Sequence, residues 1–121
     1  MIGLGLDAVE IARFRRVLAR SPGLVERLFT EGERAYSAGF ADPAPRLAAR
    51  FAAKEATMKA LGVGLGAFGF HEVEVCNGPG GAPSLRLSGR AAALAEARGV
   101  TSLRMSITHT DVVAEAVVAA L

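Results

Sequence analysis

The sequence predicts an α+β domain with a mainly antiparallel sheet and helices packed on one face of that sheet. Strand-like and helix-like segments are segregated along the chain and do not alternate strictly, as a parallel α/β sheet would require. The turn sequence NGPGGA at 77–82 lies between two short alternating segments and predicts a β-hairpin. A chain of 121 residues has room for one hydrophobic core, so we expect a single domain over residues 1–121.

The first third of the chain predicts a strand, a basic helix and a short capped helix. Residues 2–10 alternate between apolar and polar side chains, which is typical of a strand. The apolar residues of segment 11–20 recur at helical spacing, and the sequence SPG that follows ends this helix. Thr30 and Glu33 match a capping box, which predicts a second helix that runs to about Gly39.

The longest predicted helix covers residues 46–61. Asp42 and Pro43 precede it as a cap and a proline suited to the first helical position, and Gly62 follows it as a terminator. Strands dominate the remaining segment, which contains one further helix. The elements expected there are strands over 71–77 and 83–87, a helix over 90–98 that Gly99 ends, and strands over 102–108 and 112–119.

The composition is that of a globular protein in a reducing compartment. Hydrophobic residues make up 51% of the chain and charged residues 21%, which argues against disorder. Cys76 is the only cysteine, so the sequence holds no disulfide framework, and a cytoplasmic location is expected. We expect neither secretion nor a membrane partner. The chain starts without a signal sequence, and no apolar run approaches the roughly 18 residues of a membrane helix.

Positive charge is concentrated in the predicted helix 11–20. The first 50 residues hold eight arginines and six acidic residues, whereas the rest of the chain holds six charges of each sign. Four of these arginines lie within eight residues that contain no acid: Arg13, Arg15, Arg16 and Arg20. Such a patch favours an acidic partner or a phosphate, although a solvated helix face has the same appearance. No nucleic-acid partner is expected, because the chain lacks an aromatic strand pattern that would stack bases.

The group Lys54, Glu55 and Lys59 in the longest predicted helix is the first candidate for chemistry. Glu55 and Lys59 stand four residues apart and therefore share a helix face, as an ordinary surface ion pair also would. Asp7 lies near the end of the first strand, where it could also cap the following helix. Two carboxylates from distant segments can bind Mg²⁺ together with waters and phosphate oxygens. Asp7 and Glu55 are therefore the predicted metal pair.

The remaining motifs are absent or weak. The chain has no P-loop, no CxxC pair, no HExxH and no nucleophile elbow. The sequence GLGL at 3–6 lacks the third glycine of a dinucleotide fingerprint. His109 lies at a predicted turn beside Ser106, Thr108 and Thr110. There it could contact phosphate or act as a base, or it could be an exposed or structurally hydrogen-bonded histidine.

Four separated segments match one known pattern in the same order. They are GLGLD at 3–7 with Glu10 and Arg13, RFAAKEA at 50–56 with KALG at 59–62, the hairpin turn at 77–83, and SITHT at 106–110. With these segments the chain resembles the holo-acyl-carrier-protein synthase family, the small class of phosphopantetheinyl transferases. The resemblance spans nearly the whole chain, and the string FAAKEA at this distance from an N-terminal Gly-x-Asp is highly specific.

The resemblance implies a Mg²⁺-dependent transfer of the 4′-phosphopantetheine arm from coenzyme A to a serine hydroxyl of apo-acyl carrier protein, with adenosine 3′,5′-bisphosphate released. The residues that match Asp7 and Glu55 would hold the metal together with the coenzyme A pyrophosphate. Lys59 would neutralise charge that builds on the pyrophosphate during the attack. The base that takes the serine proton stays open among Glu55, a water on the metal and His109. Fatty-acid and polyketide carrier proteins both stay open as the partner.

The resemblance further implies a homotrimer with active sites at subunit interfaces. Coenzyme A would lie between the Asp7-like and Glu55-like residues of one chain and the closing strands of a neighbour. The residues expected to bind it are Arg50, Lys59, Gly81, Pro83, His109 and Thr110. Ala82 departs from the family pattern, in which a Lys or Arg commonly precedes the matching proline. We therefore expect a side-chain contact to the nucleotide to be absent and backbone donors at Gly81 to remain.

The same resemblance implies a binding partner for the basic helix 11–20. Acyl carrier proteins are strongly acidic, and their recognition helix would meet Arg13, Arg20 and Arg27. Arg15 and Arg16 are expected to point elsewhere on the helix. Complementary charge of this kind raises the rate of encounter and makes binding sensitive to salt.

Two other interpretations belong to different functional classes. A non-catalytic carrier-protein or nucleotide-binding module could keep the fold without turnover, but the joint presence of all the predicted metal and catalytic residues argues against it. A small basic RNA-binding domain is the other alternative, and it predicts that nucleic-acid affinity falls steeply with salt.

Overall fold

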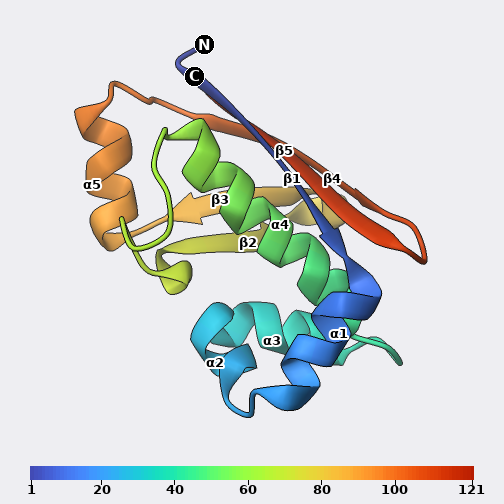
Figure 1. Ribbon diagram of the computed structural model, residues 1–121. Helices are drawn as coiled ribbons and strands as arrows, with labels where there is room; N and C mark the ends of the chain where they lie inside the picture. Colours follow the sequence, from blue (N-terminus) through green and yellow to red (C-terminus); the bar gives the residue numbers. More distant parts are fainter.

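A long helix lies against a three-stranded antiparallel sheet, and a β-hairpin packs beside the same helix (Figure 1). The structure is a computed structural model that describes residues 1–121. Its α-helices are α1 (Ile11–Arg20), α2 (Leu24–Leu28), α3 (Glu31–Ala38), α4 (Ala44–Ala60) and α5 (Gly89–Ala97). Its strands are β1 (Gly3–Glu10), β2 (Val73–Asn77), β3 (Pro83–Leu87), β4 (Leu103–His109) and β5 (Val113–Ala120), and the 3₁₀ turns η1 (Phe70–Glu72) and η2 (Pro79–Gly81) flank β2.

β5 is the central strand of the three-stranded sheet, with β1 on one side and β4 on the other. The antiparallel register places Asp7 of β1 opposite Ala116 of β5, which in turn pairs with Ile107 of β4. β2 and β3 pair with each other across the predicted hairpin turn. The prediction of an α+β domain with mainly antiparallel strands is confirmed. The strands form two sheets, because α5 separates β3 from β4 and no tight turn brings these two strands into register.

β1 and α4 approach each other closely because glycines remove the side chains that would lie between them. A Cβ atom on Gly3 would lie 1.8 Å from the carbonyl oxygen of Ala60. A Cβ atom on Gly5 would lie 1.8 Å from the carbonyl oxygen of Ala56, which is itself fully buried. The GLGL sequence therefore serves helix–strand packing. This packing brings the end of β1 to the middle of α4.

The opposite face of the three-stranded sheet carries no helix (Figure 1). Successive residues of a strand point to opposite faces, so Leu4 and Leu6 face away from α4. Their exposed fractions are 59% and 64%. The sheet thus presents one covered face to the core and one uncovered face, on which the apolar Leu4 and Leu6 of β1 lie along with the polar Arg104 and Ser106 of β4.

The start of α4 differs from the sequence prediction. The helix begins at Ala44, and Pro43 precedes it without a side-chain cap. Asp42 accepts a hydrogen bond from the Ala44 N–H at 3.4 Å, but Arg15 holds its two carboxylate oxygens at 2.7 and 3.0 Å. Asp42 therefore binds Arg15 of α1 more closely than it binds the start of α4.

None of the helices, not even the 17-residue α4, combines the length and the apolar character that a membrane crossing requires.

Two short elements were not predicted. α2 contains five residues, too few for a helical period to show in the sequence. The strand expected over 71–77 begins at Val73, because residues 70–72 form η1. The Glu72 carboxylate accepts the backbone N–H groups of Gly69 and Arg90 at 2.9 Å each, and these bonds stabilise the turn.

Candidate active site

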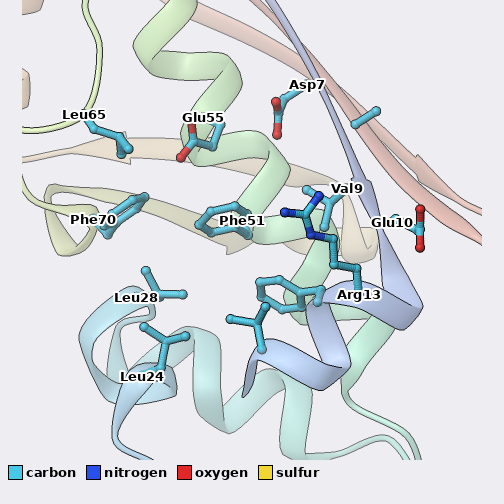
Figure 2. Close-up of a pocket in the computed structure, with 13 residues that line it drawn as sticks. Asp7, Val9, Glu10, Arg13, Leu24, Leu28, Phe51, Glu55, Leu65 and Phe70 are labelled. Carbon is cyan, nitrogen blue, oxygen red and sulfur yellow. The ribbon is translucent and has the colours of Figure 1, made fainter. Parts of the chain in front are cut away.

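Asp7 and Glu55 lie at the same end of a cavity that β1, α1, α2 and α4 line together (Figure 2). Asp7 is an odd-numbered residue of β1, so its side chain faces α4 as Gly5 and Val9 do. Glu55 lies in the middle of α4, one helical turn from Phe51. The close packing of β1 on α4 therefore brings together two carboxylates from distant parts of the chain, as the predicted metal pair requires.

The two carboxylates share one neighbouring cation, Lys59. The Lys59 Nζ atom lies 3.2 Å from Asp7 Oδ1 and donates a hydrogen bond to the Leu6 carbonyl oxygen at 2.9 Å. Burial raises the pKa of Glu55, and the negative charge of Asp7 raises it further, while Lys59 lowers it. Glu55 is therefore a partly desolvated carboxyl group beside a second negative charge.

The Asp7–Glu55 pair fits a hard divalent cation. No three or more His, Cys, Asp and Glu side chains converge anywhere in the structure, so the protein offers no complete metal cage. Mg²⁺ does not need one, because it usually keeps several waters and binds one or two carboxylates together with phosphate oxygens. Zn²⁺ would require three or four protein ligands. The repulsion between the carboxylates, which contributes to the raised pKa of Glu55, is an interaction that a cation between them would reverse.

The cavity beside this pair is largely apolar. Its volume is about 630 Å³, and nine of its 13 lining residues are hydrophobic. The rings of Phe51 and Phe70 stack within it, with centroids 5.7 Å apart. Figure 2 shows Leu65 and Phe70 on one side of Glu55 and the exposed Arg13 on the other. A charged end beside an apolar body suits a phosphate ester that carries a partly apolar group.

Lys54 does not belong to this site, although in the sequence it forms one charged group with Glu55 and Lys59. Its side chain is fully buried and lies 2.7 Å from Glu33 of α3. It also donates to the backbone carbonyl oxygens of Phe70 at 2.8 Å and Val73 at 2.5 Å. Neighbouring helix residues point about 100° apart, so Lys54 faces α3 and β2 while Glu55 faces the cavity. Lys54 is therefore a structural residue.

Arg50 forms a second polar cluster with the hairpin and α3. The residue is only 2% exposed, and its Nη2 atom donates to Asn77 Oδ1 at 2.5 Å. Its guanidinium carbon lies 4.2 Å from the ring centroid of Tyr36, a residue that the sequence analysis did not select. Two features of the sequence could have drawn attention to Tyr36: it is the only tyrosine of the chain, and it lies in the helix that the capping box begins. Arg50 does not line the cavity of Asp7 and Glu55.

His109 and Thr110 also lie outside that cavity. His109 ends β4 and pairs with Ala114 of β5, so β5 separates it from β1. The Thr110 hydroxyl oxygen accepts the N–H groups of Val112 and Val113 at 3.1 Å each. Thr110 therefore stabilises the turn between β4 and β5, and His109 projects beside that turn as an exposed residue.

Gly81 and Pro83 lie at the hairpin between β2 and β3. The Gly81 N–H donates to the Gly78 carbonyl oxygen at 2.9 Å, and the Gly81 carbonyl oxygen accepts from Asn77 Nδ2 at 3.2 Å. The backbone donor expected to remain at Gly81 is thus already used within the turn. Pro83 begins β3 opposite Asn77, the residue that also binds Arg50.

The arginines near α1 are of two kinds. Arg15 forms the ion pair with Asp42 already described. The exposed arginines that form no ion pair are Arg13, Arg16 and Arg20 of α1 and Arg27 of α2. Spacings of three and four residues place Arg16 on the same helix face as Arg13 and Arg20. The expectation that Arg16 points elsewhere is therefore wrong, and only Arg15 is set apart.

Curated relatives match almost the full chain. A holo-[acyl-carrier-protein] synthase of Frankia casuarinae is 49% identical over 120 residues, which cover 99% of this chain and 97% of the relative. A holo-[acyl-carrier-protein] synthase of Moorella thermoacetica is 44% identical and covers 97% of this chain and 91% of its own length. At this identity and coverage the relatives share the whole domain and not only a motif.

Solved structures have the same fold. Holo-[acyl-carrier-protein] synthase from Neisseria meningitidis superposes with a TM-score of 0.91 at 28% identity, over 100% of this chain and 98% of the other. The Helicobacter pylori enzyme in complex with coenzyme A gives 0.86 at 32% identity, over 98% and 99% of the two chains. The family model described as "4'-phosphopantetheinyl transferase superfamily" matches residues 3–118. The chain therefore belongs to the 4′-phosphopantetheinyl transferase superfamily.

Proposed function

We propose that this chain transfers the 4′-phosphopantetheine arm of coenzyme A to a serine hydroxyl of apo-acyl carrier protein and releases adenosine 3′,5′-bisphosphate. The relatives described above carry the name holo-[acyl-carrier-protein] synthase, and one was solved with coenzyme A. The observation that carries the proposal is the Asp7–Glu55 pair at the charged end of an apolar cavity. It offers a site for a pyrophosphate with a divalent cation, next to space for the arm.

The transfer breaks the phosphoanhydride bond of the coenzyme A pyrophosphate and forms a phosphate ester bond to the serine oxygen. The serine oxygen attacks the phosphorus that carries the arm, and the bond from that phosphorus to the bridging oxygen breaks. The adenosine bisphosphate leaves with the bonding electrons. Mg²⁺ held by Asp7 and Glu55 would neutralise charge on the pyrophosphate. Lys59, the cation nearest to this pair, would add a second positive charge.

The serine proton needs a base within hydrogen-bond reach of the attacking oxygen. Glu55 lines the cavity of its own chain and is therefore within reach of a serine that enters it. His109 is exposed outside that cavity and could serve such a site only from a second copy of the chain. We assign the proton to Glu55 when a single chain is considered.

A homotrimer with active sites between subunits is part of the proposal. Two observations support it. The face of the sheet that carries the exposed Leu4 and Leu6 is suited to burial against another chain. Of the residues expected to bind coenzyme A, Lys59 contacts Asp7, whereas Arg50, the hairpin and His109 lie outside the Asp7–Glu55 cavity. A contact between two copies could bring these outlying residues of one chain to the cavity of the other.

An acidic carrier protein in the cytoplasm completes the proposal. The unpaired arginines of α1 and α2 adjoin the cavity through Arg13, so a bound acidic helix would place its serine near Glu55. The free thiol of Cys76 is consistent with a reducing compartment, where coenzyme A is also used.

The decisive experiment is mass spectrometry of apo-acyl carrier protein after incubation with this protein, coenzyme A and Mg²⁺. We expect a mass gain of one phosphopantetheine group, which EDTA and the Glu55→Gln variant both abolish. Glu96→Gln is the matched control, because Glu96 is an exposed residue of α5 outside the cavity. No mass gain with carrier proteins of fatty-acid and polyketide synthesis would contradict the proposal.

The alternative is a non-catalytic module that binds coenzyme A or a carrier protein. It predicts that the protein binds either molecule without modifying the serine, and that Glu55→Gln keeps this affinity. Binding measured by calorimetry alongside the mass spectrometry separates the two functions, since only the enzyme converts bound substrates to products.

A further inference from the structure

Lys59 contacts the same carboxylate that is proposed to hold the metal. Its Nζ atom lies 3.2 Å from Asp7 Oδ1 and 2.9 Å from the carbonyl oxygen of Leu6. The side chain therefore reaches from the last turn of α4 to the middle of β1 and contacts two oxygen atoms there. One positive charge already stands at the Asp7 carboxylate.

This contact is open to exchange. The Lys59 side chain is 53% exposed, whereas the Asp7 side chain is 17% exposed. Solvent weakens an ion pair of this kind, and the flexible four-carbon stem of lysine lets the ammonium group move to another acceptor. The ammonium can therefore leave Asp7 without unfolding any part of α4.

The pair of carboxylates retains an attraction for a further cation. Glu55 makes no ion pair, and one ammonium group leaves the two carboxylates with a net charge of −1 when both are ionised. A second cation at this place would lie close to the Lys59 ammonium group and would be repelled by it.

We propose that Lys59 stands in for the divalent cation at Asp7 in the free protein, and that a pyrophosphate group draws Lys59 away, so that metal and coenzyme bind cooperatively. The inference rests on the proposed function, which supplies the metal and the pyrophosphate. A metal ion that arrives alone has to displace the ammonium group and then repels it. A metal ion that arrives with pyrophosphate provides that ammonium group with new oxygen partners.

Removal of Lys59 should raise the Mg²⁺ affinity of the free protein and reduce the gain in Mg²⁺ affinity that coenzyme A causes. In the Lys59→Met variant, Mg²⁺ affinity without coenzyme A should rise by about fivefold or more, the lower end of typical coupling between sites. The increase in Mg²⁺ affinity that coenzyme A causes should shrink by a similar factor. A lysine that only helps to hold the metal site together would instead lower Mg²⁺ affinity when removed.

Isothermal titration of the full chain with Mg²⁺, with and without coenzyme A, tests this directly and does not depend on turnover. Lys59→Arg keeps the positive charge and should restore the weak metal affinity of the unmodified protein. Arg16→Met is the matched control, because it removes an exposed charge that makes no ion pair and lies away from Asp7. Circular dichroism shows whether each variant is folded before titration.

Asp7→Asn separates failure of this inference from failure of the proposed function. If Asp7→Asn binds Mg²⁺ as well as the unmodified protein does, the metal site itself is wrong, and both this inference and the Mg²⁺ site of the proposed function are overturned, while the transfer to the carrier protein is tested separately by the mass gain. If Asp7→Asn abolishes Mg²⁺ binding while Lys59→Met leaves it unchanged or weaker, the metal site stands and the role of Lys59 is overturned.

Discussion

The carboxyl group of Glu55 lies where its charged form is disfavoured. Burial raises its pKa above the ordinary 4.5, the charge of Asp7 raises it further, and Lys59 opposes both. A carboxyl group whose pKa is higher in the folded than in the unfolded protein binds more protons when the protein is folded. Its stabilising contribution is therefore present below the ordinary pKa and is lost as the pH rises through the folded value.

We predict that Glu55→Gln is more stable than the unmodified protein near neutral pH when EDTA is present. Glutamine has nearly the same shape but no charge, so the cost of an ionised Glu55 disappears. The advantage should shrink as the pH is lowered to roughly 4, where Glu55 is itself protonated. Urea unfolding at the two pH values measures the difference. A variant that is less stable than the unmodified protein at both would contradict the prediction.

At the scale of elements, the contact between β1 and α4 positions the active-site pair. Gly5 of β1 lies against the backbone of Ala56 in α4. Gly5 is two residues before Asp7, and Ala56 directly follows Glu55. The distance between these elements therefore also sets how Asp7 approaches Glu55. A change in the packing at Gly5 should alter stability and metal binding together.

Gly5→Ala tests this coupling. The added Cβ would lie 1.8 Å from the Ala56 carbonyl oxygen, so strand and helix have to move apart, at a cost of about 1–3 kcal/mol or more. We expect lower unfolding free energy in urea and weaker Mg²⁺ binding in the folded fraction. Gly64→Ala is the control, because no atom lies within 4 Å of a Cβ at that position. Equal stability of the two variants would argue against close packing at Gly5.

Two neighbouring arginines of α1 differ in whether they form an ion pair. Arg15 is held by Asp42, whereas Arg16 is exposed on the face that carries Arg13 and Arg20. A partner that binds this face can use Arg16 without breaking an existing ion pair. The structure therefore adds Arg16 to the residues proposed to meet the carrier protein.

We predict that Arg16→Ala raises the KM for acyl carrier protein by up to about fivefold at low salt, the range of an exposed charge pair. The kcat should change little, since the charge acts on encounter and not on the transfer. Arg15→Ala removes the neighbouring charge and should raise the KM for acyl carrier protein less than Arg16→Ala does. Steady-state kinetics at two salt concentrations tests both variants. A larger effect of Arg15→Ala would show that the carrier protein uses a different helix face.

At the scale of the whole molecule, the predicted site residues do not all meet in one cavity. Asp7 and Glu55 line one cavity, while the Arg50–Asn77 pair and His109 lie outside it. The uncovered sheet face with its exposed leucines offers a surface through which copies could join. If one active site takes the group of Asp7 and Glu55 from one chain and His109 from another, defects in the two chains can compensate each other.

Complementation between inactive variants tests this arrangement. We expect Asp7→Asn and His109→Ala to be nearly inactive alone, and activity to return in part when the two are unfolded together and refolded as a mixture. Some mixed interfaces then combine an intact Asp7 group with an intact His109 group. Asp7→Asn mixed with Glu55→Gln is the control, because both changes damage the same group. Absence of recovery in the first mixture, with assembly confirmed by light scattering, would place each active site within one chain.

Local patterns in the sequence were sufficient for most elements. Helix 11–20 was predicted with the bounds that the structure has, because its apolar spacing is regular. The capping box of Thr30 and Glu33 is formed in both directions, at 2.9 and 3.2 Å. The start of α4 was not predictable in the same way, since Asp42 binds Arg15, which is distant in sequence.

Sequence by itself determined the order of the longer helices and of the strands, the α+β class and the candidate carboxylates, because periodicity and residue chemistry act over short stretches of chain. Only the tertiary structure decided that Glu55 belongs to the cavity while its neighbour Lys54 is buried against Glu33. It also decided that Lys59 reaches Asp7. These outcomes depend on which face of α4 packs against β1 and which against α3 and β2. The spacing of residues along α4 shows which of them share a face, but not which element that face contacts.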